Sequence, residues 1–142
     1  MPRQAPGSDA TTRHLLSLCG PLPERPRVLD LGCGPGRSAL LLAEEAGDGA
    51  EVTAVDLHGP FLDELRTAAA ARGLADRVRP VTADMGALPC QDGSFDLVWA
   101  EGSAYTIGFD TALARWKPLL APGATLVLTE CEWTAAEPSA GA

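Results

Sequence analysis

The fold of this chain is decided by the stretch Val28-Leu29-Asp30-Leu31-Gly32-Cys33-Gly34-Pro35-Gly36. Its first half is a short apolar run typical of a buried strand, and its second half is a glycine-rich turn that ends the strand. Glycine permits positive φ angles and has no Cβ atom, so a ligand can lie directly against this backbone. Open α/β sheets bind their ligands at turns of this kind, at the carboxyl ends of their strands.

Outward from this stretch, short apolar strands alternate with helical segments. We expect strands at residues 27–31, 51–56, 78–82, 95–100 and 125–129, and helices at about 8–18, 38–46, 61–71 and 111–120. The dipeptide Pro122-Gly123 is expected to turn the chain into the last strand. This alternation predicts an α/β domain with a mainly parallel sheet of about five strands, covered by helices on both faces.

One domain is expected over residues 8–133, with a flexible arm at 1–7 and a tail at 134–142. The chain of 142 residues is long enough to bury a core. Apolar residues make up 46% and charged residues 21% of the chain, and these ordinary proportions argue against general disorder.

Charge and cysteine usage exclude several classes of partner. The net charge is −8 and no basic run is present, which disfavours a nucleic-acid surface. The four cysteines have neither CxxC spacing nor a histidine at metal-ligand distance, so we expect reduced thiols and no metal site. No apolar run reaches membrane-spanning length and no signal peptide opens the chain. These features predict a cytoplasmic protein.

Asp30 precedes the first glycine of the turn and separates two classes of ligand. A dinucleotide would place its pyrophosphate here, and a buried carboxylate would repel it. S-adenosylmethionine instead presents an ammonium and a sulfonium group, both of which a nearby carboxylate favours. Asp30 therefore favours the methyl donor over NAD, with capping of the turn as the structural alternative.

Two further acids lie at the ends of the next two strands: Asp56 ends the second strand, and Asp84 follows the third. Asp56 can accept hydrogen bonds from both ribose hydroxyls of an adenosine ligand, and its structural alternative is the N-cap of the next helix. Asp84 can accept a bond from the amine of adenine while the backbone N–H of Met85 serves a ring nitrogen. On its own, Asp84 is equally well explained as a loop acid.

The motifs together resemble those of class I S-adenosylmethionine-dependent methyltransferases, in the order that this family has. They are residues 30–36, 56, 83–85, 94–99 and 119–126. Residues 56–65 and 100–109 show a finer similarity to bacterial small-molecule enzymes of the methyltransferase-domain type. The resemblance implies a Rossmann-like three-layer sandwich that transfers a methyl group from S-adenosylmethionine to a small-molecule acceptor.

The resemblance also implies roles for single residues. It implies that the glycine loop holds the amino-acid portion of the donor, through Gly32, Cys33, Gly34 and Gly36. Leu57 follows the ribose-binding acid and is implied to pack on the adenine. Cys33 is interpreted as a small spacer in this loop and not as a nucleophile.

The catalytic candidates are Glu101 and Tyr105, which follow the fourth strand at the ligand edge. Methyl transfer from a sulfonium depends mostly on positioning, and a base is needed only if the acceptor loses a proton. Glu101 can be that base, orient the acceptor, or be a structural acid; Tyr105 can line the pocket or pack. His58 is expected to be an exposed helix-start residue, and Trp99 and Trp116 are expected in the core.

The family fold adds two strands and further helices after the fifth strand, whereas this chain stops nine residues after Trp133. We therefore expect an incomplete fold, whose fifth strand is a sheet edge unless a partner or a second copy covers it. A non-catalytic or truncated donor-binding module that needs a partner is the alternative function. A nucleotide-dependent oxidoreductase is a third interpretation, which Asp30 disfavours.

Overall fold

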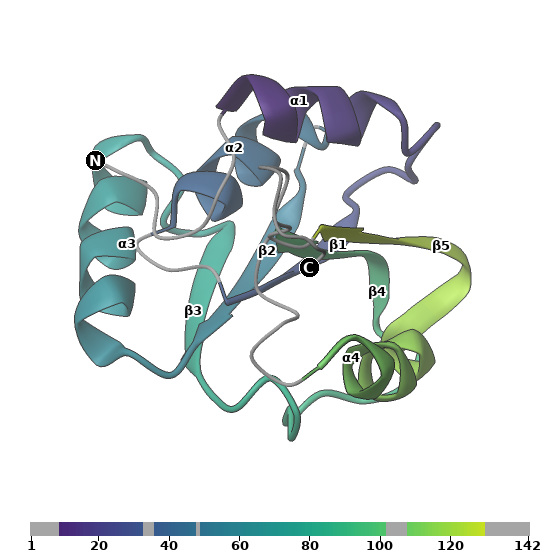
Figure 1. The fold of residues 1–142 in the computed structure, drawn as a ribbon. Helices are drawn as coiled ribbons and strands as arrows, with labels where there is room; N and C mark the ends of the chain where they lie inside the picture. The colour runs from purple at the N-terminus through teal and green to yellow at the C-terminus, as the bar shows by residue number, and fades with distance from the viewer. Residues whose placement is uncertain (1–8, 33–35, 48, 102–107, 130–142) are drawn as a thin grey trace, which may run out of the picture.

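The structure is a computed structural model and describes residues 9–32, 36–47, 49–101 and 108–129. Five parallel strands form one sheet in the order β3-β2-β1-β4-β5 (Figure 1). The strands are β1 (Arg27–Leu31), β2 (Glu51–Asp56), β3 (Val78–Thr82), β4 (Phe95–Glu101) and β5 (Leu120–Thr129). The helices are α1 (Asp9–Ser17), α2 (Arg37–Glu45), α3 (Gly59–Ala71) and α4 (Phe109–Trp116), followed by the 3₁₀ turn η2 (Lys117–Leu119).

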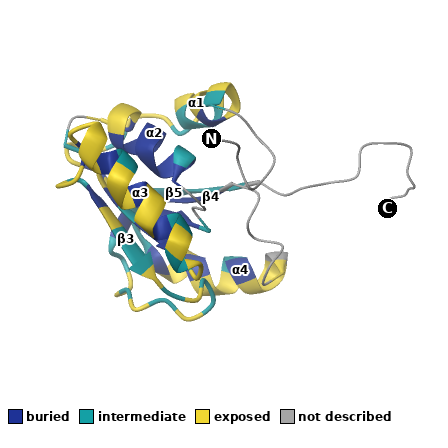
Figure 2. Ribbon diagram, turned by 90° about the vertical axis from the view of Figure 1, so that its left-hand side faces the viewer, coloured by how far each residue is buried: buried dark blue, intermediate teal, exposed yellow. Residues whose placement is uncertain are grey.

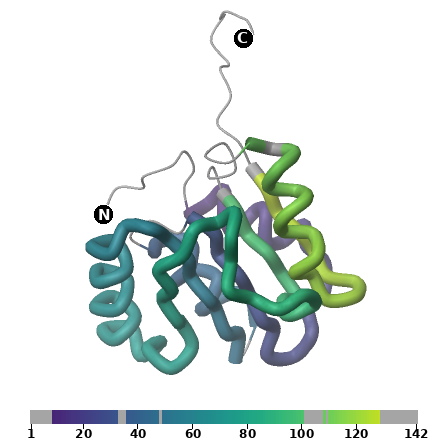
Figure 3. The backbone as a smooth tube through the Cα atoms, turned by 90° about the horizontal axis from the view of Figure 1, so that it is seen from below, coloured from purple at the N-terminus to yellow at the C-terminus, as the bar shows by residue number. Residues whose placement is uncertain are grey.

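The sheet is the middle of three layers. One hydrophobic cluster joins it to α2 and α3, with α1 packed on α2, and a second cluster joins its other face to α4. Figure 2 shows the buried residues of these helices turned toward the sheet. Figure 3 shows α3 and α4 on opposite sides of the molecule. The predicted α/β three-layer sandwich is confirmed.

β1 occupies the centre of the sheet and is buried on both faces. Its last four residues, Val28 to Leu31, are all buried, as expected for a strand covered by helices on each side. From β1 the chain builds outward to β2 and β3, and then returns to place β4 on the other side of β1. The strand order thus reverses at β1, and such a switch point opens a crevice for a ligand at the carboxyl ends of the strands.

The structure corrects the predicted boundary between the last helix and the last strand. The α-helix ends at Trp116 and not near Leu120, because Pro118 has no N–H to continue its hydrogen-bond ladder. β5 begins at Leu120, so the predicted turn at Pro122-Gly123 lies inside the strand. The extra residues of this segment are accommodated by a register shift in the pairing of β4 with β5 between Phe95 and Leu97. Gly123 has a φ of 78° in this segment.

β5 ends the strand order in the part of the chain that the structure describes. This placement agrees with the expectation that the fifth strand is an edge. The predicted arm at 1–7, the tail at 134–142 and Trp133 lie outside the described residues.

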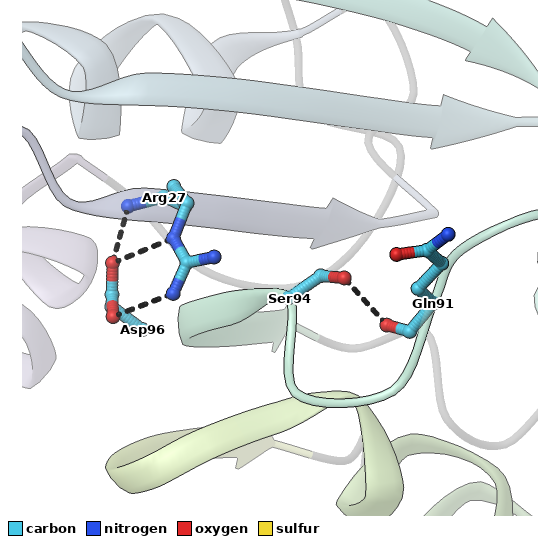
Figure 4. A network of polar contacts seen from close by, with 4 residues as sticks. All are labelled: Arg27, Gln91, Ser94 and Asp96. Atoms are coloured by element: carbon cyan, nitrogen blue, oxygen red, sulfur yellow. Dashed lines mark hydrogen bonds and ion pairs between the residues drawn. The ribbon is translucent and has the colours of Figure 1, made fainter.

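An ion pair joins the amino ends of the two central strands (Figure 4). The backbone N–H of Arg27 donates to Oδ2 of Asp96 at 2.8 Å, and Nε and Nη2 of its guanidinium donate to Oδ2 and Oδ1, each at 3.3 Å. Burial acts to raise the pKa of Asp96, but the hydrogen bonds and charge of Arg27 outweigh it and hold this pKa below its ordinary value.

Asp96→Asn is expected to lower the free energy of unfolding by about 1–2 kcal/mol at neutral pH. A carboxylate with a depressed folded-state pKa contributes stability above its unfolded pKa of about 3.9, and this contribution disappears as the pH falls through the folded pKa. The difference in the free energy of unfolding between the variant and the wild type should therefore be constant from about pH 6 to 8. It should shrink as the pH falls below about 4. Urea unfolding at a series of pH values measures this difference.

Asp63→Asn is the matched control, because Asp63 pairs with Arg66 on the exposed face of α3 and its side chain is 79% exposed. It should leave stability nearly unchanged at every pH. An Asp96→Asn difference of equal size at pH 3 and pH 7 would show that the Arg27 pair is not its source.

Candidate functional site

Four acids of the sequence prediction come to the same edge of the sheet. Asp30 lies near the end of β1, Asp56 and Glu101 end β2 and β4, and Asp84 follows β3 by two residues. Parallel strands point the same way, so these residues lie along the carboxyl edge. Backbone hydrogen bonds join the strand ends there: Gly32 N–H donates to the Val55 carbonyl at 2.9 Å, and Ala83 N–H donates to the Asp56 carbonyl at 3.2 Å.

Asp30 is buried at this edge, with 1% of its surface exposed. The hydroxyl of Ser38, on the first turn of α2, donates to its Oδ2 at 2.7 Å. This bond reaches across the glycine turn and ties the end of β1 to the start of α2. A buried carboxylate is tolerated only with hydrogen-bonding partners, so the turn brings Asp30 and Ser38 together as a unit.

Gly36 meets two separate requirements for glycine at the end of the turn. Its φ is 97°, in the left-handed region, and it forms the N-cap of α2. A Cβ atom at this position would lie 2.3 Å from Cδ1 and 3.1 Å from Cβ of Leu65, a fully buried residue of α3. The end of the turn is therefore in close contact with α3.

Asp56 forms a turn of its own at the end of β2. Its Oδ1 accepts a hydrogen bond from the backbone N–H of His58 at 2.9 Å, which is an Asx turn. The N-cap of α3 is His58, an exposed residue as expected, so Asp56 does not have the alternative role of N-cap. Leu57 between them is 66% exposed.

The loop after β3 is stabilised by a hydrogen bond inside the loop and by another from α4. Oδ1 of exposed Asp84 accepts a hydrogen bond from Gly86 N–H at 2.7 Å. The carbonyl of Met85 accepts one from Nε1 of Trp116 at 2.9 Å. Trp116 and Trp99 are fully buried, which confirms their predicted place in the core. The contact to Met85 was missed, although a buried tryptophan N–H needs an acceptor and this need was the available indication.

The remaining predicted site residues are described only in part. Cys33, Gly34 and Tyr105 lie outside the described residues. Glu101 is the last residue of β4, and its backbone is in register with Thr129 of β5. Among the described residues there is no group of three His, Cys, Asp or Glu side chains that could hold a metal ion. Within the same ranges, every helix is too short or too polar to cross a membrane.

Comparison with known proteins identifies the family of this domain. Residues 28–123 match the family described as "Methyltransferase domain", and the chain belongs to that family. The match includes the glycine turn and the acids at or near the ends of β1, β2 and β3, which are Asp30, Asp56 and Asp84. The resemblance to class I methyltransferases and the Rossmann-like fold that it implied are confirmed.

Three similar proteins show how far the likeness extends. Demethylmenaquinone methyltransferase of Thermus thermophilus is 45% identical over 105 residues, which are 73% of this chain and 46% of that protein. Methyltransferase GfsG of Streptomyces halstedii is 34% identical over 105 residues, 73% of this chain and 37% of that protein. The solved structure of the 4+2 cyclase SpnF superposes with a TM-score of 0.76 at 31% identity, covering 86% of this chain and 44% of that one. The chain thus spans less than half the length of each.

Proposed function

We propose that this chain binds S-adenosylmethionine at the carboxyl edge of its sheet, as part of an enzyme that transfers the methyl group to a small-molecule acceptor. The observation that carries this proposal is the buried carboxylate of Asp30, held by Ser38 at the topological switch point. A negative charge in a site of low dielectric attracts the cationic groups of this donor and repels a pyrophosphate.

The other residues of the edge fit the successive parts of the donor. The amino-acid portion lies against the glycine turn, the ribose hydroxyls bind the Asp56 carboxylate, and the exposed Leu57 contacts the adenine face. Asp84 and the backbone N–H of Met85 recognise the edge of the adenine. The donor-binding residues of this proposal are Asp30, Gly32, Cys33, Gly34, Gly36, Asp56, Leu57, Asp84 and Met85.

Bound S-adenosylmethionine supplies a methyl group on a sulfonium, which makes that carbon electrophilic. The contribution of the chain is to align this carbon with the acceptor and to exclude water, because in-line displacement depends on positioning. We place Glu101 and Tyr105 on the acceptor side, since they follow β4 at the same edge. Glu101 takes the proton of an acceptor that must lose one, and Tyr105 lines the pocket.

The charge of the chain and the edge of its sheet bear on the partners and location of the domain. A net charge of −8 supports a small-molecule acceptor and not a nucleic acid. The pattern of the four cysteines supports a cytoplasmic location. The edge of β5 supports a partner or a second copy that covers it.

SpnF gives a reason to consider a second function. It is named as a cyclase and it is 31% identical to this chain, so this fold also occurs in a protein named for another reaction. The second candidate is accordingly a domain that binds the donor and does not transfer its methyl group. The methyltransferase names of the sequence relatives support the first candidate.

Calorimetric titration with S-adenosylhomocysteine and with NAD tests the ligand class. We expect S-adenosylhomocysteine to bind with a dissociation constant in the range of about 1 μM to 1 mM and NAD to give no heat of binding. Binding of NAD alone would overturn the proposal. A donor with a labelled methyl group, offered with a panel of metabolites, then separates the two functions: label in an acceptor supports methyl transfer, and donor binding without label in any acceptor supports the second candidate.

A further inference from the structure

Ser38 lies two residues after Gly36 and makes a short buried contact with the predicted site. Its side chain donates to Oδ2 of Asp30 at 2.7 Å, and only 7% of its surface is exposed. The hydrogen bond is therefore shielded from water on both sides. A hydrogen bond from a neutral donor to a buried carboxylate is one of the stronger kinds in proteins.

The position of Ser38 makes its hydroxyl a fixed donor. It lies on the first turn of α2, and the residues that follow it, Ala39 to Leu42, are all buried. The Asp30 carboxylate is therefore held by a rigid helix on one side and by the central strand on the other. A hydrogen bond to the charged form of a carboxylate favours that form and fixes its direction.

We propose that Ser38 is a positioning residue that acts through Asp30 and makes the site selective for ligands with an ammonium group. The inference rests on the proposed function, because the ammonium belongs to the amino-acid end of the donor. Ser38 does not contact the ligand in this proposal. It sets where the negative charge of Asp30 lies, and a displacement of that charge weakens its attraction for the ammonium.

Two ligands that share an adenosine separate this role from a structural one. S-Adenosylhomocysteine carries the amino-acid portion, whereas 5′-methylthioadenosine ends in a methyl group on the sulfur. Ser38→Ala is expected to weaken the binding of S-adenosylhomocysteine about tenfold and to leave that of 5′-methylthioadenosine unchanged. Calorimetry measures both dissociation constants, and their ratio is the readout.

Ser94→Ala is the matched control. The Ser94 hydroxyl donates to the carbonyl of Gln91 at 2.6 Å, in the turn before β4 at the opposite edge of the sheet (Figure 4). Its loss removes a serine hydroxyl hydrogen bond to a backbone carbonyl, away from Asp30, so both ligands should bind as they do to the wild type. In an Asp30→Asn background, Ser38→Ala should not change the ratio further, because residues that act as a unit are not additive.

The outcomes distinguish the inference from the proposed function. If the wild type binds neither ligand, the proposed function fails. If the wild type binds both and Ser38→Ala weakens them equally, Ser38 only supports the fold and the inference is overturned. An unchanged affinity of Ser38→Ala for S-adenosylhomocysteine overturns it as well.

Discussion

Replacement of Asp30 by asparagine is expected to weaken the binding of S-adenosylhomocysteine by about 10- to 100-fold, the range for loss of a hydrogen-bonded charge. The amide has nearly the shape of the carboxylate, so the change removes the charge and leaves the packing. It also keeps an oxygen that can accept the bond from Ser38. The effect should exceed that of Ser38→Ala, because the charge itself is lost and not only its position.

Stability should respond differently from affinity in this variant. Burial of a carboxylate is costly, and its replacement by a neutral group of similar volume is often tolerated. We therefore expect a change in the free energy of unfolding of about 1 kcal/mol or less, measured with urea beside the calorimetric titration. Asp76→Asn, at an exposed acid before β3, is the control and should bind as the wild type does. Equal affinities of Asp30→Asn and Asp76→Asn for S-adenosylhomocysteine would show that the charge of Asp30 does not attract this ligand. That result would contradict the proposed function.

Gly36→Ala is expected to have the largest effect on stability, a loss of about 2–4 kcal/mol in the free energy of unfolding. One part of this loss comes from forcing an L-residue to a φ of 97°. The other comes from the new Cβ, which would lie 2.3 Å from Cδ1 of Leu65. The Leu65 side chain cannot simply turn away, because it is fully buried and its own Cβ lies 3.1 Å from the same point.

Gly73→Ala separates these two parts. Gly73 has a φ of 72°, but a Cβ there would meet no atom within 4 Å. This variant should therefore lose only about 1 kcal/mol, the conformational part alone. Chemical denaturation of both variants gives the difference. An equal loss at the two positions would show that α3 moves away from the glycine turn at no cost.

The bounds of the first three strands were predictable to the residue. β1, β2 and β3 have the bounds expected from sequence, because β-branched and apolar residues recur in each short run between turn-forming or polar segments. The region from Trp116 to Gly123 was harder, since Pro118 and Pro122 both indicate a break and only tertiary pairing decides which becomes part of a strand. A register shift against β4 has no local sequence pattern.

The candidate site shows the same division. The acids at the strand ends could be identified because their places follow from chain order and from the direction of parallel strands. The hydrogen bonds from Ser38 to Asp30 and from Trp116 to Met85 could not be predicted, because a side-chain hydrogen bond between distant elements depends on how those elements pack. The sequence predicts Ser38 only as the start of a helix and Trp116 only as a core residue.

The strand order has a consequence for biosynthesis. The pairs β1–β2 and β2–β3 join strands that are neighbours in the sequence. By contrast, Arg27 of β1 pairs with Asp96 of β4, which lies 69 positions later in the chain. A chain emerging from the ribosome can therefore assemble β1, β2 and β3 with their helices before β4 exists, since local contacts form sooner than distant ones. During that interval one side of β1 is an open edge. The end of β1 and Asp56 at the end of β2 are placed early, so the nascent domain acquires much of the carboxyl edge of its sheet before β4 pairs with β1.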